Sequence, residues 1–126
     1  MNTTSKLLLL LGSFNAALAV MLGAFGAHAL KARLSEQMLA VYQTGVQYHF
    51  YHALGLLVLG LIAFHLPASS WIKWSGWLMF SGIILFSGSL YLLALSNIRW
   101  LGMITPIGGM AFILAWFMLV TAIVKG

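Results

Sequence analysis

Four long apolar stretches dominate the chain, and each is close to the length that crosses a lipid bilayer. They cover residues 7–27, 45–64, 74–95 and 102–124. A helix rises 1.5 Å per residue, so about 20 apolar residues span the hydrocarbon core. Lipid offers the backbone no hydrogen-bond partners, and a spanning segment must therefore be a helix or part of a closed barrel. The pattern predicts four transmembrane helices.

The connections between these stretches are short. Pro67 and the serines that follow it interrupt the helical pattern after the second stretch, and residues 97–100 form the turn before the fourth. Helices joined by short connections lie antiparallel. We therefore expect an all-α membrane protein, with residues 1–126 forming one antiparallel up-down four-helix transmembrane bundle.

The first connection has a helical pattern of its own. Apolar residues recur at helical spacing from Leu30 to Val41, with charged and amide side chains between them. Ser35 followed by Glu36 is typical of a helix start. The pattern predicts a short interfacial amphipathic helix over residues 35–43, between the first two spans, continuing into the second with a bend near Gly45.

The composition excludes a water-soluble protein. Hydrophobic residues make up 63% of the 126 residues and charged residues only 6%, whereas soluble domains carry roughly 25% charged residues. Six basic residues oppose one acid, but the basic residues are scattered in the sequence and resemble anchors at lipid headgroups rather than a stripe along nucleic acid. The chain has no cysteine, which excludes thiol catalysis and disulfides. We expect the lipid bilayer, and no nucleic acid, as the surroundings of this chain.

The ends of the first span allow a second interpretation. An apolar core followed by Ala27-His28-Ala29 imitates a signal peptide with its cleavage site. The apolar stretch is about 21 residues long, which is more typical of a spanning helix. We expect the first span to be retained.

The basic residues nearly balance across the membrane. The side with both termini carries Lys6, Lys73, Lys125 and the terminal amine. The other side carries Lys31 and Arg33 in the first connection and Arg99 in the third. Cytoplasmic loops carry an excess of Lys and Arg. The small excess of positive charge on the side of the termini favours a multi-pass membrane protein with both termini in the cytoplasm.

Antiparallel topology brings polar residues of all four spans into one leaflet. His52 lies eight residues beyond Thr44, which is about 12 Å along a helix. Intramembrane polar groups are costly and face the bundle interior or a wet cavity. We therefore predict a polar cluster confined to one leaflet as the candidate ligand site. Its members are His28, Tyr48, His52, Ser87, Ser89, Tyr91 and Thr105.

The cluster has more than one interpretation. Such residues hydrogen-bond across helices and hold a bundle together, each contributing about 0.6 kcal/mol. They can instead bind a quinone, a lipid headgroup or a small solute, and His28, His49 and His52 provide imidazoles for a metal or haem. A single acid, Glu36, excludes a catalytic carboxylate pair, and no serine lies in a nucleophile motif. We expect no enzyme activity and no cofactor, and a protein that acts through helix–helix association with itself or with a membrane-protein partner.

Four motif blocks carry a resemblance to a known family. They are Gly23-Ala24-Phe25-Gly26-Ala27-His28; Thr44-Gly45 with Tyr48 and His52; Leu85-Phe86-Ser87-Gly88-Ser89-Leu90-Tyr91; and Thr105-Pro106-Ile107-Gly108-Gly109 with Trp116. In this order they resemble the YgdD-type family, the domain-of-unknown-function 423 family, whose animal relatives are called transmembrane protein 256. His49 is not part of the family pattern. The resemblance implies a four-helix bacterial inner-membrane protein and implies no activity.

Overall fold

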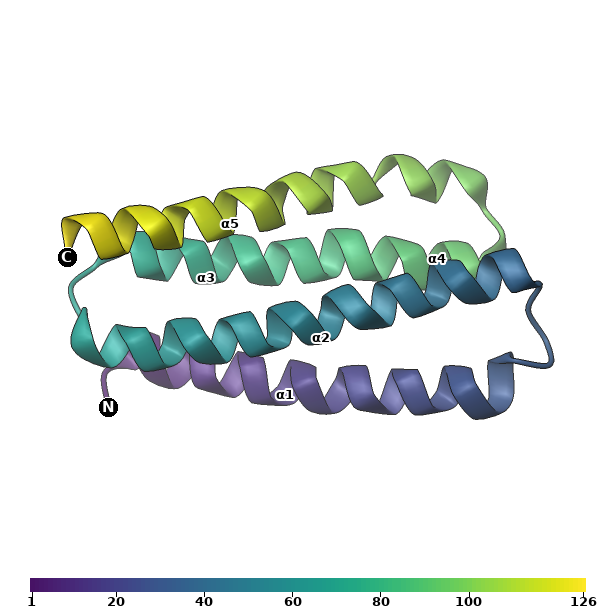
Figure 1. The fold of residues 1–126 in the computed structure, drawn as a ribbon, viewed down its shortest axis with the longest axis horizontal. Helices are drawn as coiled ribbons and strands as arrows, with labels where there is room; N and C mark the ends of the chain where they lie inside the picture. Colours follow the sequence, from purple (N-terminus) through teal and green to yellow (C-terminus); the bar gives the residue numbers. More distant parts are fainter.

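The computed structural model describes all 126 residues, which form four long helical rods (Figure 1). Each rod is apolar and long enough to cross a membrane, which confirms the four predicted spans. The elements are α1 (Thr3–Phe25), the π-helical turn η1 (Gly26–Leu30), α2 (Glu36–His65), α3 (Ser70–Gly82), the π-helical turn η2 (Ile83–Ser87), α4 (Gly88–Ser96), the 3-10 turn η3 (Arg99–Met103) and α5 (Thr105–Lys125).

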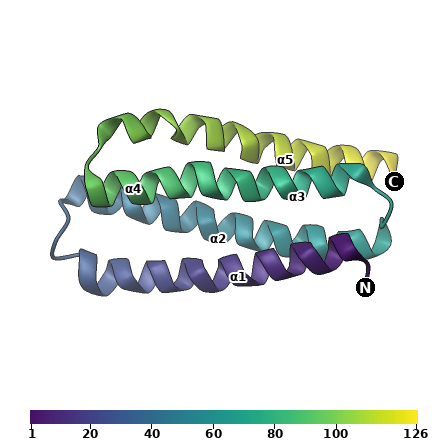
Figure 2. The same ribbon diagram turned by 180° about the vertical axis from the view of Figure 1, so that it is seen from behind.

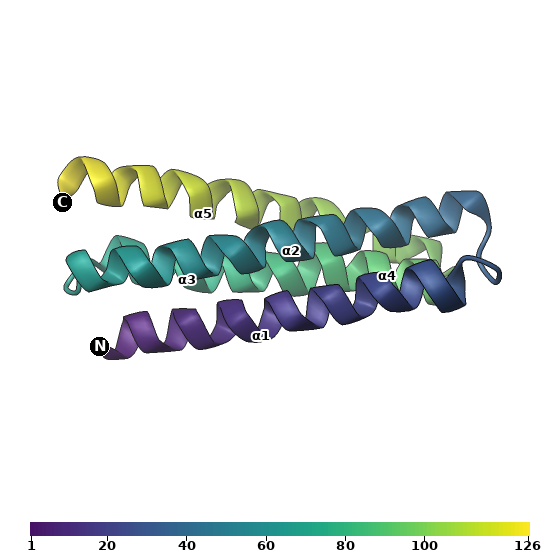
Figure 3. The same cartoon turned by 60° about the horizontal axis from the view of Figure 1, so that its bottom comes forward.

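Neighbouring rods run antiparallel, as the short connections predict. Figures 1 and 2 show α1 beside α2, then α3 with α4, and finally α5, with both termini at the same end of the bundle. In Figure 3, α1 and α5 lie on opposite sides of the central pair formed by α2 and the α3–α4 rod. The central pair is therefore shielded by protein on two sides, while α1 and α5 have most of their surface toward lipid.

The first connection differs from the prediction. Ser35 does begin a helix, because its Oγ accepts a hydrogen bond from the Met38 backbone N–H at 3.1 Å. However, residues 36–43 are the first turns of α2 and not a separate interfacial helix, since α2 continues unbroken from Glu36 to His65. One glycine does not break a helix when its space is filled, and the Tyr91 ring packs against Gly45.

The other helix ends follow the local chemistry of their residues. Asn97 ends α4 with φ 59°, a left-handed conformation that asparagine tolerates better than most residues. Pro106 lies in the first turn of α5, where its missing N–H has no intrahelical partner in any case. Asn2 caps α1 by accepting a hydrogen bond from the Ser5 N–H at 2.8 Å.

The core lies between the central pair and α5. Leu56 and Leu59 of α2, Ile72 and Met79 of α3, and Ala115 of α5 are completely buried in one cluster. Large apolar side chains also cover the outside, and Phe14 and Phe117 are about two-thirds exposed, at 67% and 65%. An outer surface of this kind is stable in lipid and not in water, which agrees with a membrane protein.

Glycine allows α5 to touch the third rod backbone to backbone. A Cβ atom on Gly108 would lie 2.8 Å from the carbonyl carbon of Leu85 and would collide with the backbone nitrogen of Phe86. Backbone atoms cannot rotate away as a side chain can. Close approach through small residues is typical of membrane helices, because dispersion contacts there provide much of the association energy.

Gly108→Ala and Gly88→Ala form a matched pair of substitutions that tests this contact. Gly108→Ala forces a methyl group into backbone, and we expect a loss of about 1–3 kcal/mol of stability, as in overpacked cores. A Cβ on Gly88 meets no atom within 4 Å, so Gly88→Ala should leave the stability unchanged or slightly higher. Thermal unfolding of both variants in one detergent measures the difference. Equal melting temperatures for the two variants would contradict the packing described here.

Candidate functional site

His49 is the centre of the polar interior. Its ring is buried, and it is held by one residue from each neighbouring rod. Nε2 lies 2.9 Å from Oδ1 of Asn15 on α1, and Nδ1 lies 2.9 Å from the hydroxyl of Tyr91 on α4. One side chain of α2 thus joins three rods in the membrane interior.

The hydrogens of this chain of contacts can be assigned from donor and acceptor types. The Nδ2 amide group of Asn15 donates to the Leu11 carbonyl at 2.8 Å, so its Oδ1 faces His49 as an acceptor. His49 Nε2 must then carry a hydrogen and donate it. In a neutral imidazole the remaining Nδ1 accepts, and the Tyr91 hydroxyl is its donor. All the hydrogen bonds that link Asn15, His49 and Tyr91 are therefore made by neutral groups.

His52, one turn further along α2, has the opposite tautomer. Its Nδ1 lies 2.8 Å from the Tyr48 carbonyl oxygen and must donate, while Nε2 accepts from the indole N–H of Trp116 at 3.0 Å. The ring is stacked on Phe112 with centroids 3.5 Å apart and planes 7° apart. Both Trp116 and Phe112 belong to α5, so His52 fastens α2 to the fourth rod.

The serine and threonine hydroxyls of the predicted cluster also form hydrogen bonds between rods. Ser87 donates to the Gly45 carbonyl at 2.7 Å and joins the third rod to α2. Ser89 and Thr105 lie 2.6 Å apart, which joins α4 to α5, and Ser89 also donates to the Phe86 carbonyl. Each of these contacts joins groups within the bundle.

The structure brings five of the seven predicted site residues into this polar interior. These five are His52, Ser87, Ser89, Tyr91 and Thr105. His28 lies exposed in η1 at the end of the first rod and joins none of these contacts. Tyr48 is 38% exposed, and its ring packs on Phe86 while its hydroxyl has no partner.

The polar interior is not confined to one leaflet. Because α2 begins at Glu36, His49 lies 13 residues into a helix of 30, or about 20 Å from its start, which is close to the middle of the span. Asn15 lies close to the middle of the first rod. Ser75, in the opposite half, donates to the Ala115 carbonyl at 2.6 Å. Polar contacts therefore extend from one half of the bundle across its centre.

Sequence reasoning missed several of these residues. The sequence-based prediction does not include Asn15 in the cluster, and it gives His49 only as a candidate imidazole for a metal or haem. Tyr42, fully buried with its hydroxyl donating to the Leu22 carbonyl, was not singled out. The available signal was position: residues 42, 45, 49, 52, 53 and 56 recur at helical spacing and share the buried face of α2.

The histidines do not form a metal site. No group of three or more His, Cys, Asp or Glu side chains is close enough to hold a metal ion. Both ring nitrogens of His49 and of His52 already have protein partners. A metal or haem would have to displace those partners.

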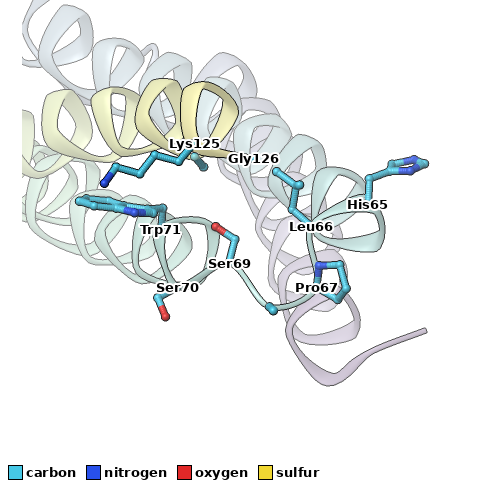
Figure 4. A pocket seen from close by; sticks show the side chains of 10 residues that line it. His65, Leu66, Pro67, Ser69, Ser70, Trp71, Lys125 and Gly126 are labelled. Carbon is cyan, nitrogen blue, oxygen red and sulfur yellow. The ribbon is translucent and has the colours of Figure 1, made fainter.

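Besides a hollow of about 440 Å³ lined by Ser89, Tyr91 and Leu101, two hollows in the surface are large enough to consider as sites. One, of about 510 Å³, lies at the end of the bundle between the α2–α3 connection and the end of α5 (Figure 4). There the Lys125 amine lies over the Trp71 ring, 5.5 Å from its centroid, while the His65 ring points away. The other, of about 430 Å³, is an apolar groove between α1 and the η2–α4 region, with Asn15, His49 and Tyr91 at its base.

Comparison with known proteins places the chain in a family. Residues 22–109 match the family described as a protein of unknown function, DUF423. The chain belongs to this family. The matched region of this DUF423 member contains His49, His52 and Tyr91, but Asn15 and Trp116 lie outside it.

Curated relatives of this DUF423 member are named membrane proteins. The UPF0382 membrane protein YwdK of Bacillus subtilis (strain 168) is 54% identical over 120 residues, covering 95% of this chain and 98% of the relative. The UPF0382 membrane protein SERP0230 of Staphylococcus epidermidis is 50% identical, covering 95% and 97%. No solved structure matches the chain. With its four apolar rods, this DUF423 member is a multi-pass membrane protein in a lipid bilayer.

A double-mutant cycle between Asn15→Ala and His49→Ala tests the central hydrogen bond. Each substitution leaves a buried partner unpaired, so each lowers stability. The double variant should lose less than the sum of the two, with a coupling energy of about 0.6–1.7 kcal/mol, typical of hydrogen bonds between membrane helices. Unfolding in mixed detergent measures the three variants against the wild type.

Ser81→Ala is the control for this cycle. Ser81 is lipid-exposed and bonds only within its own helix, to the Trp77 carbonyl. The stability changes caused by Ser81→Ala and His49→Ala should therefore add, with no coupling energy between them. Purely additive effects of Asn15→Ala and His49→Ala would show that the contact holds no coupling energy.

Proposed function

We propose that this DUF423 member is not an enzyme and that it acts in the membrane by associating with other transmembrane helices. The polar side chains of its interior bond to one another and to backbone carbonyls, as His49, His52 and Ser87 show. Such groups stabilise the bundle, and their nitrogen and oxygen atoms are not free to attack a substrate. The arrangement supports a structural role for the polar interior.

The observation that carries the proposal is on the outer face of α2. Gln43 and Gln47 are exposed, and neither carboxamide has a hydrogen-bond partner within the chain. A helix of 30 residues is about 45 Å long, whereas the hydrocarbon core is about 30 Å thick. Gln47, 11 residues after Glu36, then lies roughly 9 Å inside the hydrocarbon if the span is centred. An unpaired carboxamide is costly there and favours a partner helix that can bond it.

A second candidate function is the binding of a lipid-soluble ligand such as a quinone, a lipid headgroup or another small solute. It is favoured by the groove of about 430 Å³ that has Asn15, His49 and Tyr91 at its base. Gly88 lines this groove, and no atom of the chain occupies the space beside it. The groove walls are almost wholly apolar, and the polar groups at the base already bond to each other, so the first proposal has the stronger support.

We also propose that the membrane is the bacterial inner (plasma) membrane, with both termini in the cytoplasm. The relatives come from bacteria. The end of the bundle that holds both termini carries Lys6, Lys73 and Lys125 together with the terminal amine, and positive charge is retained on the cytoplasmic side. Exposed tryptophans flank this end, as at a membrane interface.

Gln43→Leu combined with Gln47→Leu tests the association. Leucine keeps the bulk of the side chain but removes the carboxamide. Two interhelical hydrogen bonds of about 0.6 kcal/mol each correspond to roughly eightfold weaker binding. Mass spectrometry of native membrane vesicles should show a complex heavier than the single chain of 13.7 kDa, with its share reduced in the double variant. Ser81→Leu, on another lipid face, should leave that share unchanged.

The same spectra separate the two candidate functions. If only single chains appear, the association proposal is wrong. The ligand interpretation would instead be supported by a single chain that carries the additional mass of a bound small molecule. That additional mass should disappear when Gly88→Leu fills the groove. Gly88→Leu leaves the His49 contacts in place, so the loss of the mass would report on the groove itself.

Single-cysteine labelling tests the orientation, because the chain has no cysteine of its own. Ala32→Cys lies in the first connection and Ser70→Cys at the start of α3, and both positions are exposed. With cytoplasmic termini, a membrane-impermeant maleimide should label Ala32→Cys in intact cells and Ser70→Cys only after lysis. The reverse pattern would invert the topology.

A further inference from the structure

The outer seam between α1 and α2 is hollow. A groove of about 310 Å³ runs along it, bordered by Gly23 and Ala24 of α1 and by Val46, Gln47 and Tyr51 of α2. A second hollow of about 230 Å³ continues it past Gly26 and Gln43. The α1 wall of the seam is open because small residues line it, and another helix can approach its backbone closely there.

Polar side chains mark the α2 edge of this hollow seam. Gln43, Gln47 and Tyr51 follow one another at a spacing of four residues and therefore share one face of the helix. All three are exposed, and none of their side chains has a hydrogen-bond partner within the chain. The seam thus combines two independent features: room for a neighbouring helix, and unpaired polar groups at hydrocarbon depth.

Chemistry and symmetry together identify a partner. A carboxamide carries both a donor and an acceptor, so it can pair with a second carboxamide through two hydrogen bonds. In a two-fold dimer whose axis is parallel to the membrane normal, each residue meets its own copy at the same depth. Gln47 then meets Gln47. A different protein would have to place a polar group at this depth by a separate coincidence.

The exposure of the rods agrees with this choice. Within an apolar segment of 18 residues in each rod, only 22% of the residues of the first rod are buried in the bundle, compared with 28–44% for the other three rods. The first rod is covered by α2 on one side and leaves the other side to its surroundings (Figure 3). A neighbour on the α1–α2 seam would cover the least buried span.

We propose that two copies of this protein form a two-fold symmetric dimer through the α1–α2 seam, with the Gln47 carboxamides paired across the axis. This inference rests on the proposed function, and it specifies both the partner and the surface. Gln43 and Tyr51 flank the pair on either side along α2, and Gly23 and Ala24 allow the partner's helices to approach. The polar interior around His49 takes no part in the contact.

Cysteine crosslinking in native membranes tests the dimer. Gln47→Cys should form a disulfide-linked dimer on mild oxidation, since a disulfide needs Cα atoms within about 7 Å. Because Gln47→Cys removes the carboxamide itself, Gln43→Cys and Tyr51→Cys keep Gln47 in place and test the same face. At least one of these two should crosslink as well.

Met110→Cys is the matched control. Met110 is lipid-exposed on α5, which lies on the opposite side of the bundle (Figure 3). Since Trp116 bonds His52 and α2 runs parallel to α5, Met110 lies at about the depth of Gln47. The Met110→Cys variant should form no disulfide-linked dimer under the same oxidation, because its cysteines lie away from the seam. Equal crosslinking at Met110→Cys would mean random collision and would overturn the proposal.

A second measurement does not depend on cysteine. Single-molecule photobleaching in dilute vesicles should show two-step traces for the wild type and about eightfold weaker dimerisation for Gln47→Leu, because the substitution removes both hydrogen bonds of the carboxamide pair. If no seam cysteine crosslinks but the vesicle spectra contain a complex with a different protein, the dimer is wrong and the proposed association stands. If every method finds single chains only, both proposals fail.

Discussion

The absence of water inside the bilayer is the constraint on which the rest of this structure depends. A polar group within the hydrocarbon finds no solvent partner, so the chain itself must supply one. The contacts among Asn15, His49 and Tyr91 meet this requirement across three rods. The bond between Trp116 and His52 meets it for the fourth. The same bonds that satisfy the polar groups therefore determine which helices are neighbours.

Close packing and polar bonding support each other in this bundle. Gly108 brings α5 against the backbone of η2, and this approach sets Phe112 of the same helix against the His52 ring. The stacked ring in turn directs its Nε2 toward Trp116. A hydrogen bond has a strict length, so it specifies an arrangement that apolar contacts alone would leave open to sliding. The glycines make that length attainable.

The inside and the outside of the bundle differ in how their polar groups are bonded. Inside, both ring nitrogens of His49 and of His52 bond to neutral donors and acceptors, and the two rings have opposite tautomers. Outside, the carboxamides of Gln43 and Gln47 have no partner within the chain. The interior therefore explains stability, whereas the outer face of α2 supports the proposed association with another helix.

The sequence by itself determined the four spans, their antiparallel order, the Ser35 cap, the turn at Asn97 and membership of the family, because hydropathy and turn chemistry act locally along the chain. It also indicated that His52, Ser87, Ser89, Tyr91 and Thr105 belong to the interior. Only the tertiary structure decided that His49 is the central residue, that α2 begins at Glu36 and that the polar contacts cross the middle of the bundle. Those features depend on the rotation and axial shift of each helix against its neighbours. Both are set by side-chain packing between residues far apart in the sequence, which no local pattern records.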